Sequence, residues 1–147
     1  MRVLGFVALA IFVTTFTVVY FTHFTDPLIF DPPFFHNIDN FYLTEIVSAF
    51  FSVFCSMLFF GASGPIIAVI QASRYASILL SATDLNGIAV SLLAIPNLLF
   101  IIAGTEYGRK SLDQMNGDDK TLSGRSQLVL GTLAMIVIIL FKIVVTK

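Results

Sequence analysis

The stretch "IIAVIQASRYASILLSA", residues 66–82, decides the fold, because it is apolar enough for a lipid bilayer and yet carries a permanent cation. Arg74 stands near its middle, and Gln71 precedes it by almost one helical turn. A helix needs about 20 apolar residues to cross the hydrocarbon core, and an arginine at the centre of such a helix costs about 2.5–3.5 kcal/mol. Whether this segment spans a membrane must therefore be decided from the rest of the chain.

The composition is that of an integral membrane protein. Of the 147 residues, 57% are hydrophobic and 12% are charged, whereas soluble domains carry roughly 25% charged residues. A globule of this size also has too little interior to hide so many apolar side chains. The net charge of −1 lacks the basic footprint of a nucleic-acid-binding protein. We expect a multi-pass protein of the plasma membrane, whose partners are the lipid bilayer, other membrane subunits or further copies of the chain.

The apolar runs predict an all-α polytopic bundle, a single domain over residues 1–147 with about five transmembrane helices. They are continuous rather than alternating, which favours helices over a barrel. The second and third runs are separated by "GASGP", which contains the turn signals of Gly and Pro. Between the third and fourth runs, Asp84 or Asn86 can cap the following helix. The predicted spans are residues 3–22, 44–61, 64–82, 87–104 and 127–145.

The distribution of basic residues favours five spans. Basic residues concentrate in cytoplasmic connections of membrane proteins, and the polar connection 23–43 contains no Lys or Arg, so we place it outside the cytoplasm. If residues 64–82 did not span, a cytoplasmic N-terminus would put the basic connection 105–126 outside. Five spans instead give a cytoplasmic N-terminus and an external C-terminus, although a tilted or re-entrant third segment stays open. The basic residues then on the cytoplasmic side are Arg2, Arg109, Lys110, Lys120 and Arg125.

The third predicted span has a face of small residues. They recur at every fourth position in two adjoining rows, and such a face lets membrane helices approach one another closely. We predict that another helix packs on this face. Its members are Ala68, Ala72, Ala76, Ser73 and Ser77.

A second stripe of the same span carries Gln71 and Arg74, which must face the bundle interior or a wet cavity. Counting from the helix ends places Asn97 of the fourth span at the level of Arg74. Pro96 cannot donate a backbone hydrogen bond and frees the carbonyl near Leu92. We predict an intramembrane polar cluster of Gln71, Arg74, Asn97 and this carbonyl. No carboxylate is expected at that depth, because Glu45 and Asp84 count to the outer side and Glu106 to the inner side.

Three functions remain open from the sequence. The chain has no G-x-S-x-G, H-E-x-x-H or Walker A motif, so we predict no enzyme and no cofactor, and favour an accessory or scaffold subunit of a larger membrane complex. The alternative is a small oligomeric transporter or channel whose solute contacts Arg74 and Asn97; a structural arginine that ties two helices together, or reaches to the cytoplasmic face, explains the same residue. The third is a metal-binding protein using the outer residues His23, Asp26 and His36.

Overall fold

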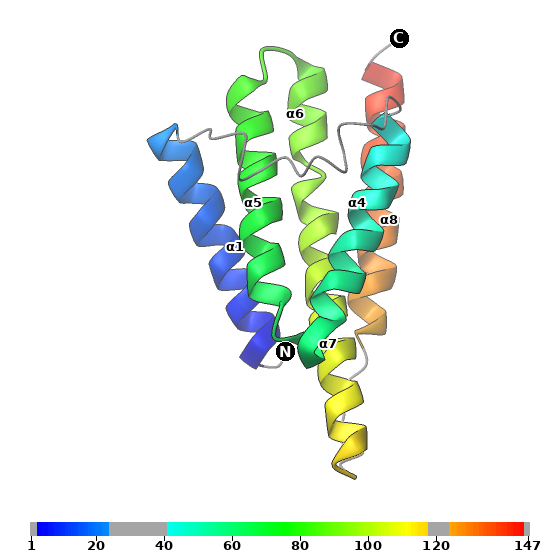
Figure 1. Ribbon diagram of the computed structural model, residues 1–147. Helices are drawn as coiled ribbons and strands as arrows, with labels where there is room; N and C mark the ends of the chain where they lie inside the picture. Colours follow the sequence, from blue (N-terminus) through cyan, green and yellow to red (C-terminus); the bar gives the residue numbers. More distant parts are fainter. Residues whose placement is uncertain (1–2, 24–40, 118–123, 146–147) are drawn as a thin grey trace.

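A computed structural model describes residues 3–23, 41–117 and 124–145, and this part of the chain is helical apart from short turns (Figure 1). The helices lie side by side along one axis, and α1 begins at the opposite end of the bundle from the end of α8 (Figure 1). The predicted all-α bundle is therefore confirmed. In chain order the elements are α1 (Val3–Thr22), α4 (Phe41–Met57), the 3-10 helix η1 (Leu58–Gly61), α5 (Gly64–Ser81), α6 (Leu85–Ser91), α7 (Ala94–Met115) and α8 (Arg125–Val145).

Four helical segments are long and apolar enough to cross a membrane, and a fifth long helix lies among them. The four are α1, α4 with η1 (Phe41–Gly61), α6 with α7 (Leu85–Met115), and α8 (Arg125–Val144). The fifth, α5, has 18 residues and packs between α1 and α7 (Figure 1). Gln71 and Arg74 make α5 less apolar than the other four helical segments. Both side chains point toward neighbouring helices.

The predicted fourth span, 87–104, is in fact two helices that meet at a break. Because Pro96 has no backbone N–H and its ring crowds the carbonyl four residues earlier, a regular α-helix cannot pass through this point. The N–H of Ile95 instead donates to the Leu92 carbonyl at 3.1 Å, and the N–H of Asn97 donates to the Leu93 carbonyl at 3.2 Å. The regular helix is therefore interrupted at Leu92 and Leu93, which separate α6 from α7.

The prediction of a polar connection from residue 105 was wrong, because α7 continues to Met115. The end of a hydrophobic run marks where a helix leaves an apolar environment, and polar residues can extend the helix beyond that point. Arg109 and Asp113, one turn apart, form an ion pair at 3.3 Å that supports this extension. Figure 1 shows the last turns of α7 projecting past the other helices.

The corner between α4 and α5 has an unusual backbone. Phe59 and Phe60 adopt positive φ angles of 51° and 57°, and Gly61 follows at 86°. A non-glycine residue in this region costs about 1–3 kcal/mol, so the corner must be held by its surroundings. The Ser63 hydroxyl does part of this by donating to the carbonyl of Leu58 at 2.8 Å. The left-handed turn reverses the chain, so that α5 runs antiparallel to α4.

Helix α7 is the centre of the bundle and packs on α1, α4, α5 and α8. Two of its glycines make the approach of α4 and η1 possible. A Cβ atom at Gly104 would collide with the backbone carbonyl of Val53, and one at Gly108 would collide with the backbone of Met57 and Gly61. The segment "GTEYG", residues 104–108, therefore acts as a close helix-packing surface of the small-xxx-small type.

Candidate functional site

A polar stripe on α4 faces the interior of the bundle. Glu45, Ser48, Ser52 and Ser56 follow one another at spacings of three and four residues, which places them on one face of the helix. All four are at most 1% exposed. We did not identify this stripe from the sequence, although its helical spacing is the signal that could have revealed it.

Arg74 forms an ion pair with the first member of this stripe. Its Nη2 atom donates to Oε1 of Glu45 at 2.6 Å, and its Nη1 atom donates to the hydroxyl of Ser48 at 2.8 Å. The side chain of Glu45 is 1% exposed and that of Arg74 is 12% exposed. Two opposite charges in a medium of low dielectric attract strongly, and the pair offsets much of the cost of burying either one.

The expectation that Arg74 has no carboxylate at its depth was wrong. Counting from helix ends assumed that α4 begins at residue 44 and that its outer end is level with the outer end of α5. Helix α4 begins earlier, at Phe41, and α5 extends beyond the start of α4 (Figure 1). Both differences bring Glu45 and Arg74 closer in height, and the long arginine side chain covers the remaining distance.

Tyr75 connects this ion pair to Asn97 on α7. The Tyr75 hydroxyl donates to Oε2 of Glu45 at 2.6 Å and accepts a hydrogen bond from Nδ2 of Asn97, also at 2.6 Å. The Arg74 guanidinium carbon lies 5.2 Å from the centre of the tyrosine ring, within the range of a cation–π contact. Tyr75 is fully buried, so its one hydroxyl links α4, α5 and α7.

Asn97 is held by its own helix and by α4. Its Nδ2 atom also donates to the carbonyl of Leu93 at 3.1 Å, and its Oδ1 atom accepts a hydrogen bond from Ser52 at 3.0 Å. The carbonyl that joins the cluster is thus that of Leu93, whereas we had predicted the one near Leu92. The Leu92 carbonyl is engaged by the short turn at the helix break, where it accepts from Ile95.

Gln71 completes the network about one turn before Arg74 on α5. Its Nε2 atom donates to the hydroxyls of Ser48 and Ser52 at 3.1 Å and 3.0 Å. The three predicted residues Gln71, Arg74 and Asn97 therefore lie in one hydrogen-bonded assembly, which we call the polar network. Its members are Glu45, Ser48, Ser52, Gln71, Arg74, Tyr75 and Asn97.

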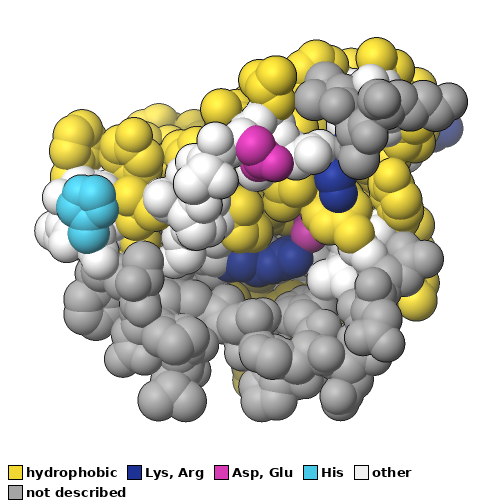
Figure 2. Space-filling model, turned by 90° about the horizontal axis from the view of Figure 1, so that it is seen from above, with side chains coloured by type: hydrophobic (Ala, Val, Ile, Leu, Met, Phe, Trp, Pro, Cys, Tyr) yellow, Lys and Arg dark blue, Asp and Glu magenta, His cyan; other side chains and the backbone are white. Residues whose placement is uncertain are grey.

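The charged part of the network lies toward the end of the bundle where α4 begins and α5 ends. Figure 2 looks onto this end and shows basic and acidic side chains recessed between hydrophobic ones. The network descends from there into the bundle along α4, α5 and α7. Chemically, it holds one cation, one anion and several neutral groups in mutual contact, an arrangement suited to fixing three helices against each other.

The small-residue face of α5 is buried, and α1 is the helix with which α5 makes its most extensive contact. Ala68, Ala72, Ala76 and Ser73 have no exposed surface, and Ser77 is half-buried. The buried residues of α1 include the small residues Gly5 and Ala8. The face and the polar network occupy different sides of α5, so this helix serves both contacts at once.

The proposed metal ligands fall largely outside the described residues. Asp26 and His36 are not described, and His23 lies exposed just after the end of α1, with a φ angle of 53°. Within residues 3–23, 41–117 and 124–145, no group of three His, Cys, Asp or Glu side chains could hold a metal ion. The metal site stays a prediction from the sequence.

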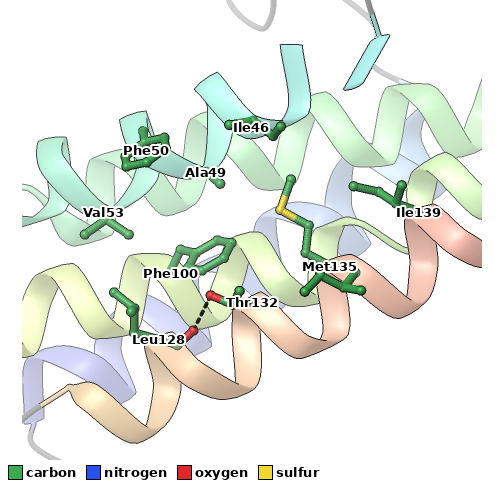
Figure 3. Close-up of a pocket in the computed structure, with 10 residues that line it drawn as sticks. Ile46, Ala49, Phe50, Val53, Phe100, Leu128, Thr132, Met135 and Ile139 are labelled. Atoms are coloured by element: carbon green, nitrogen blue, oxygen red, sulfur yellow. Dashed lines mark hydrogen bonds between the residues drawn. The ribbon is translucent and has the colours of Figure 1, made fainter. Parts of the chain in front are cut away.

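An apolar groove of about 410 Å³ lies on the other side of α4, between α4 and α8 (Figure 3). Both helices pack on α7 but scarcely on each other, and Phe100 of α7 lies between them. Ala49 and Val53 line the α4 side, and Leu128 and Met135 line the α8 side. The groove is separate from the polar network because these residues lie on a different face of α4.

Comparison with known proteins assigns no relative: no family model, curated protein or solved structure matches the chain.

Proposed function

We propose that the chain is an integral membrane protein of the plasma membrane, with its N-terminus in the cytoplasm and its C-terminus outside. The four long apolar helices support insertion. The orientation is supported by the basic residues Arg109 and Lys110 in the last turns of α7 and Arg125 at the start of α8. Both segments lie toward the end of the bundle where α1 begins (Figure 1). Such residues are retained preferentially in the cytoplasm.

We further propose that the protein is non-catalytic and serves as an accessory or scaffold subunit of a larger membrane complex. The observation that carries this proposal is the direct pairing of Arg74 with Glu45, at 2.6 Å. The intramembrane cation is engaged by a carboxylate of its own chain, in a network that ties α4, α5 and α7 together. A rigid bundle with an apolar exterior is suited to packing against other membrane helices.

Purification in mild detergent with mass spectrometry of the co-eluting chains tests the subunit proposal. We expect one or more other membrane proteins at a fixed ratio to this chain. The contact face can be located with two matched pairs of variants: Leu133→Ala with Val137→Ala on the exposed face of α8, and Phe6→Ala with Val13→Ala on the exposed face of α1. Loss of the partner with one pair and its retention with the other is the expected outcome. A monodisperse homo-oligomer free of other chains would contradict the proposal.

The second candidate function is a small oligomeric transporter or channel. The observation in its favour is that buried polar residues continue beyond the polar network toward the cytoplasmic end, namely Ser56, Thr105 and Glu106. Arg74→Ala and Arg74→Leu test this candidate in a flux assay on reconstituted vesicles, with Lys110→Ala as the control at the cytoplasmic end. Unchanged flux in both Arg74 variants would eliminate a transport pathway through the network.

A further inference from the structure

We propose that the groove between α4 and α8 binds an anionic phospholipid of the cytoplasmic leaflet, with an acyl chain in the groove and the headgroup phosphate at Arg125. This inference rests on the membrane insertion proposed above and is independent of the subunit role. Two features carry it: the shape and chemistry of the groove, and the position of a cation at its cytoplasmic end.

The groove suits a hydrocarbon chain. On α8 its lining extends from Leu128 to Ile139, a length of about 16 Å along a helix. The one hydroxyl among the lining side chains belongs to Thr132, and it donates to the carbonyl of Leu128 in its own helix at 2.8 Å (Figure 3). The lining side chains therefore offer apolar contact alone, which is what an acyl chain requires.

Arg125 lies on the groove face of α8, at the end nearer the cytoplasm. It precedes Leu128 by three residues, and Leu128 and Thr132 continue the same face at a spacing of four. Arg125 is exposed and makes no hydrogen bond or ion pair with the described part of the chain. As the first residue of α8, it stands at the level of the lipid headgroups.

At the opposite end of the groove the nearby cation, Lys142, is engaged by aromatic side chains, and this favours placing the lipid headgroup at Arg125. There the Lys142 ammonium lies 3.1 Å from the centre of the Phe41 ring, and this contact bridges α8 and α4. Lys142 is thus engaged by aromatic side chains, whereas Arg125 is presented outward. Basic pockets between transmembrane helices on the cytoplasmic side are the kind of site that binds anionic headgroups. An apolar partner helix would fill the groove, whereas an anionic lipid would use both the groove and the cation at its end.

The chain contains no tryptophan, so a single introduced tryptophan reports on its local lipid. Ile136 lines the groove, whereas its neighbour Val137 points elsewhere on α8, and both are exposed, at 49% and 64%. Ile136→Trp and Val137→Trp therefore form a matched pair at almost the same depth. Each variant is reconstituted in phosphatidylcholine vesicles that contain either brominated phosphatidylglycerol or brominated phosphatidylcholine, and quenching of fluorescence is measured.

We expect the tryptophan of Ile136→Trp to report a relative affinity for phosphatidylglycerol about fivefold above that for phosphatidylcholine, the factor that corresponds to about 1 kcal/mol for one basic residue near the surface. The tryptophan of Val137→Trp should show a ratio near one. Adding Arg125→Gln should abolish the preference at position 136, and Arg125→Lys should preserve it.

Three results would overturn the proposal. Equal quenching by both lipids at position 136 removes the anionic preference, and a preference that survives Arg125→Gln removes the role of Arg125. Protection of position 136 from both lipids, with normal quenching at position 137, assigns the groove to a protein occupant. Failure of membrane insertion is distinguishable from all of these, because neither tryptophan would then be quenched by any brominated lipid.

Discussion

Separating Arg74 from Glu45 should be far more damaging than removing both charges together. In Arg74→Met the Glu45 carboxylate, 1% exposed, loses its cation, and an orphaned buried charge typically costs about 3–5 kcal/mol. Glu45→Gln leaves Arg74, which is 12% exposed and keeps the Ser48 hydroxyl as an acceptor. We expect a smaller loss for this variant.

The double variant Glu45→Gln with Arg74→Met should recover most of the stability. The glutamine introduced on α4 can still accept a hydrogen bond from Tyr75, and the introduced methionine fills much of the volume of the arginine stem. The expected coupling between the two sites is about 2–3 kcal/mol, near the upper end for residues in contact. It is measured by reversible unfolding in mixed micelles of a mild detergent and sodium dodecyl sulfate, followed by circular dichroism.

The exposed pair Arg109–Asp113 provides a control in the same chain. Its two side chains are 45% and 14% exposed and lie 3.3 Å apart, so solvent screening should limit its contribution to about 0.3–0.5 kcal/mol. If Arg74→Met costs no more than Arg109→Ala, or if the two network substitutions are additive, the reasoning that Arg74 and Glu45 lock the bundle fails.

Three other features of the bundle lead to predictions of their own. Tyr75→Phe should cost about 1–3 kcal/mol, because Glu45 and Asn97 each lose a buried partner; the matched Tyr20→Phe, at an exposed site, should be neutral in the same unfolding assay. Gly104→Leu should yield aggregated protein on gel filtration, because its side chain meets the Val53 carbonyl, whereas Gly117→Asn, where nothing lies within 4 Å, should elute as the wild type. In a Cys55→Ser background, a membrane-impermeant maleimide should label Met115→Cys from the cytoplasmic side alone and Thr83→Cys from the outside alone. Labelling of Met115→Cys from the outside would refute five spans with a cytoplasmic N-terminus.

The sequence was sufficient for the fold class because hydrophobic runs and helix-turn signals are local properties. The start of α1 at Val3 and the turn before α5 needed nothing beyond composition and the positions of Gly and Pro. The interruption near Leu92 was also predictable, since the missing N–H of Pro96 is a local property of the chain. The extension of α7 to Met115 was missed, since the end of an apolar run does not mark the end of a helix.

Only part of the polar network could be predicted from the sequence, because the rest depends on how the helices are positioned relative to one another. Gln71, Arg74 and Asn97 could be found because each is a polar residue inside an apolar run. Glu45 lies near the end of a run, where a charge is common, and its partner depends on the relative heights of α4 and α5. That offset is a tertiary quantity, which depth counted along single helices cannot supply.

Hydrophobic attraction does not hold helices together in lipid, because the lipid tails are as apolar as the side chains. In the membrane proposed for this protein, the arrangement of the bundle would come from close packing and from polar contacts. The polar network specifies how α4, α5 and α7 meet, and Gly104 and Gly108 bring α7 against α4 and η1. Between α4 and α8 no such contact is made along the groove. The two helices are bridged at the end where α4 begins, by the contact of Lys142 with aromatic residues. This difference explains why α4, α5 and α7 are closely joined around Arg74, whereas an apolar groove is left between α4 and α8.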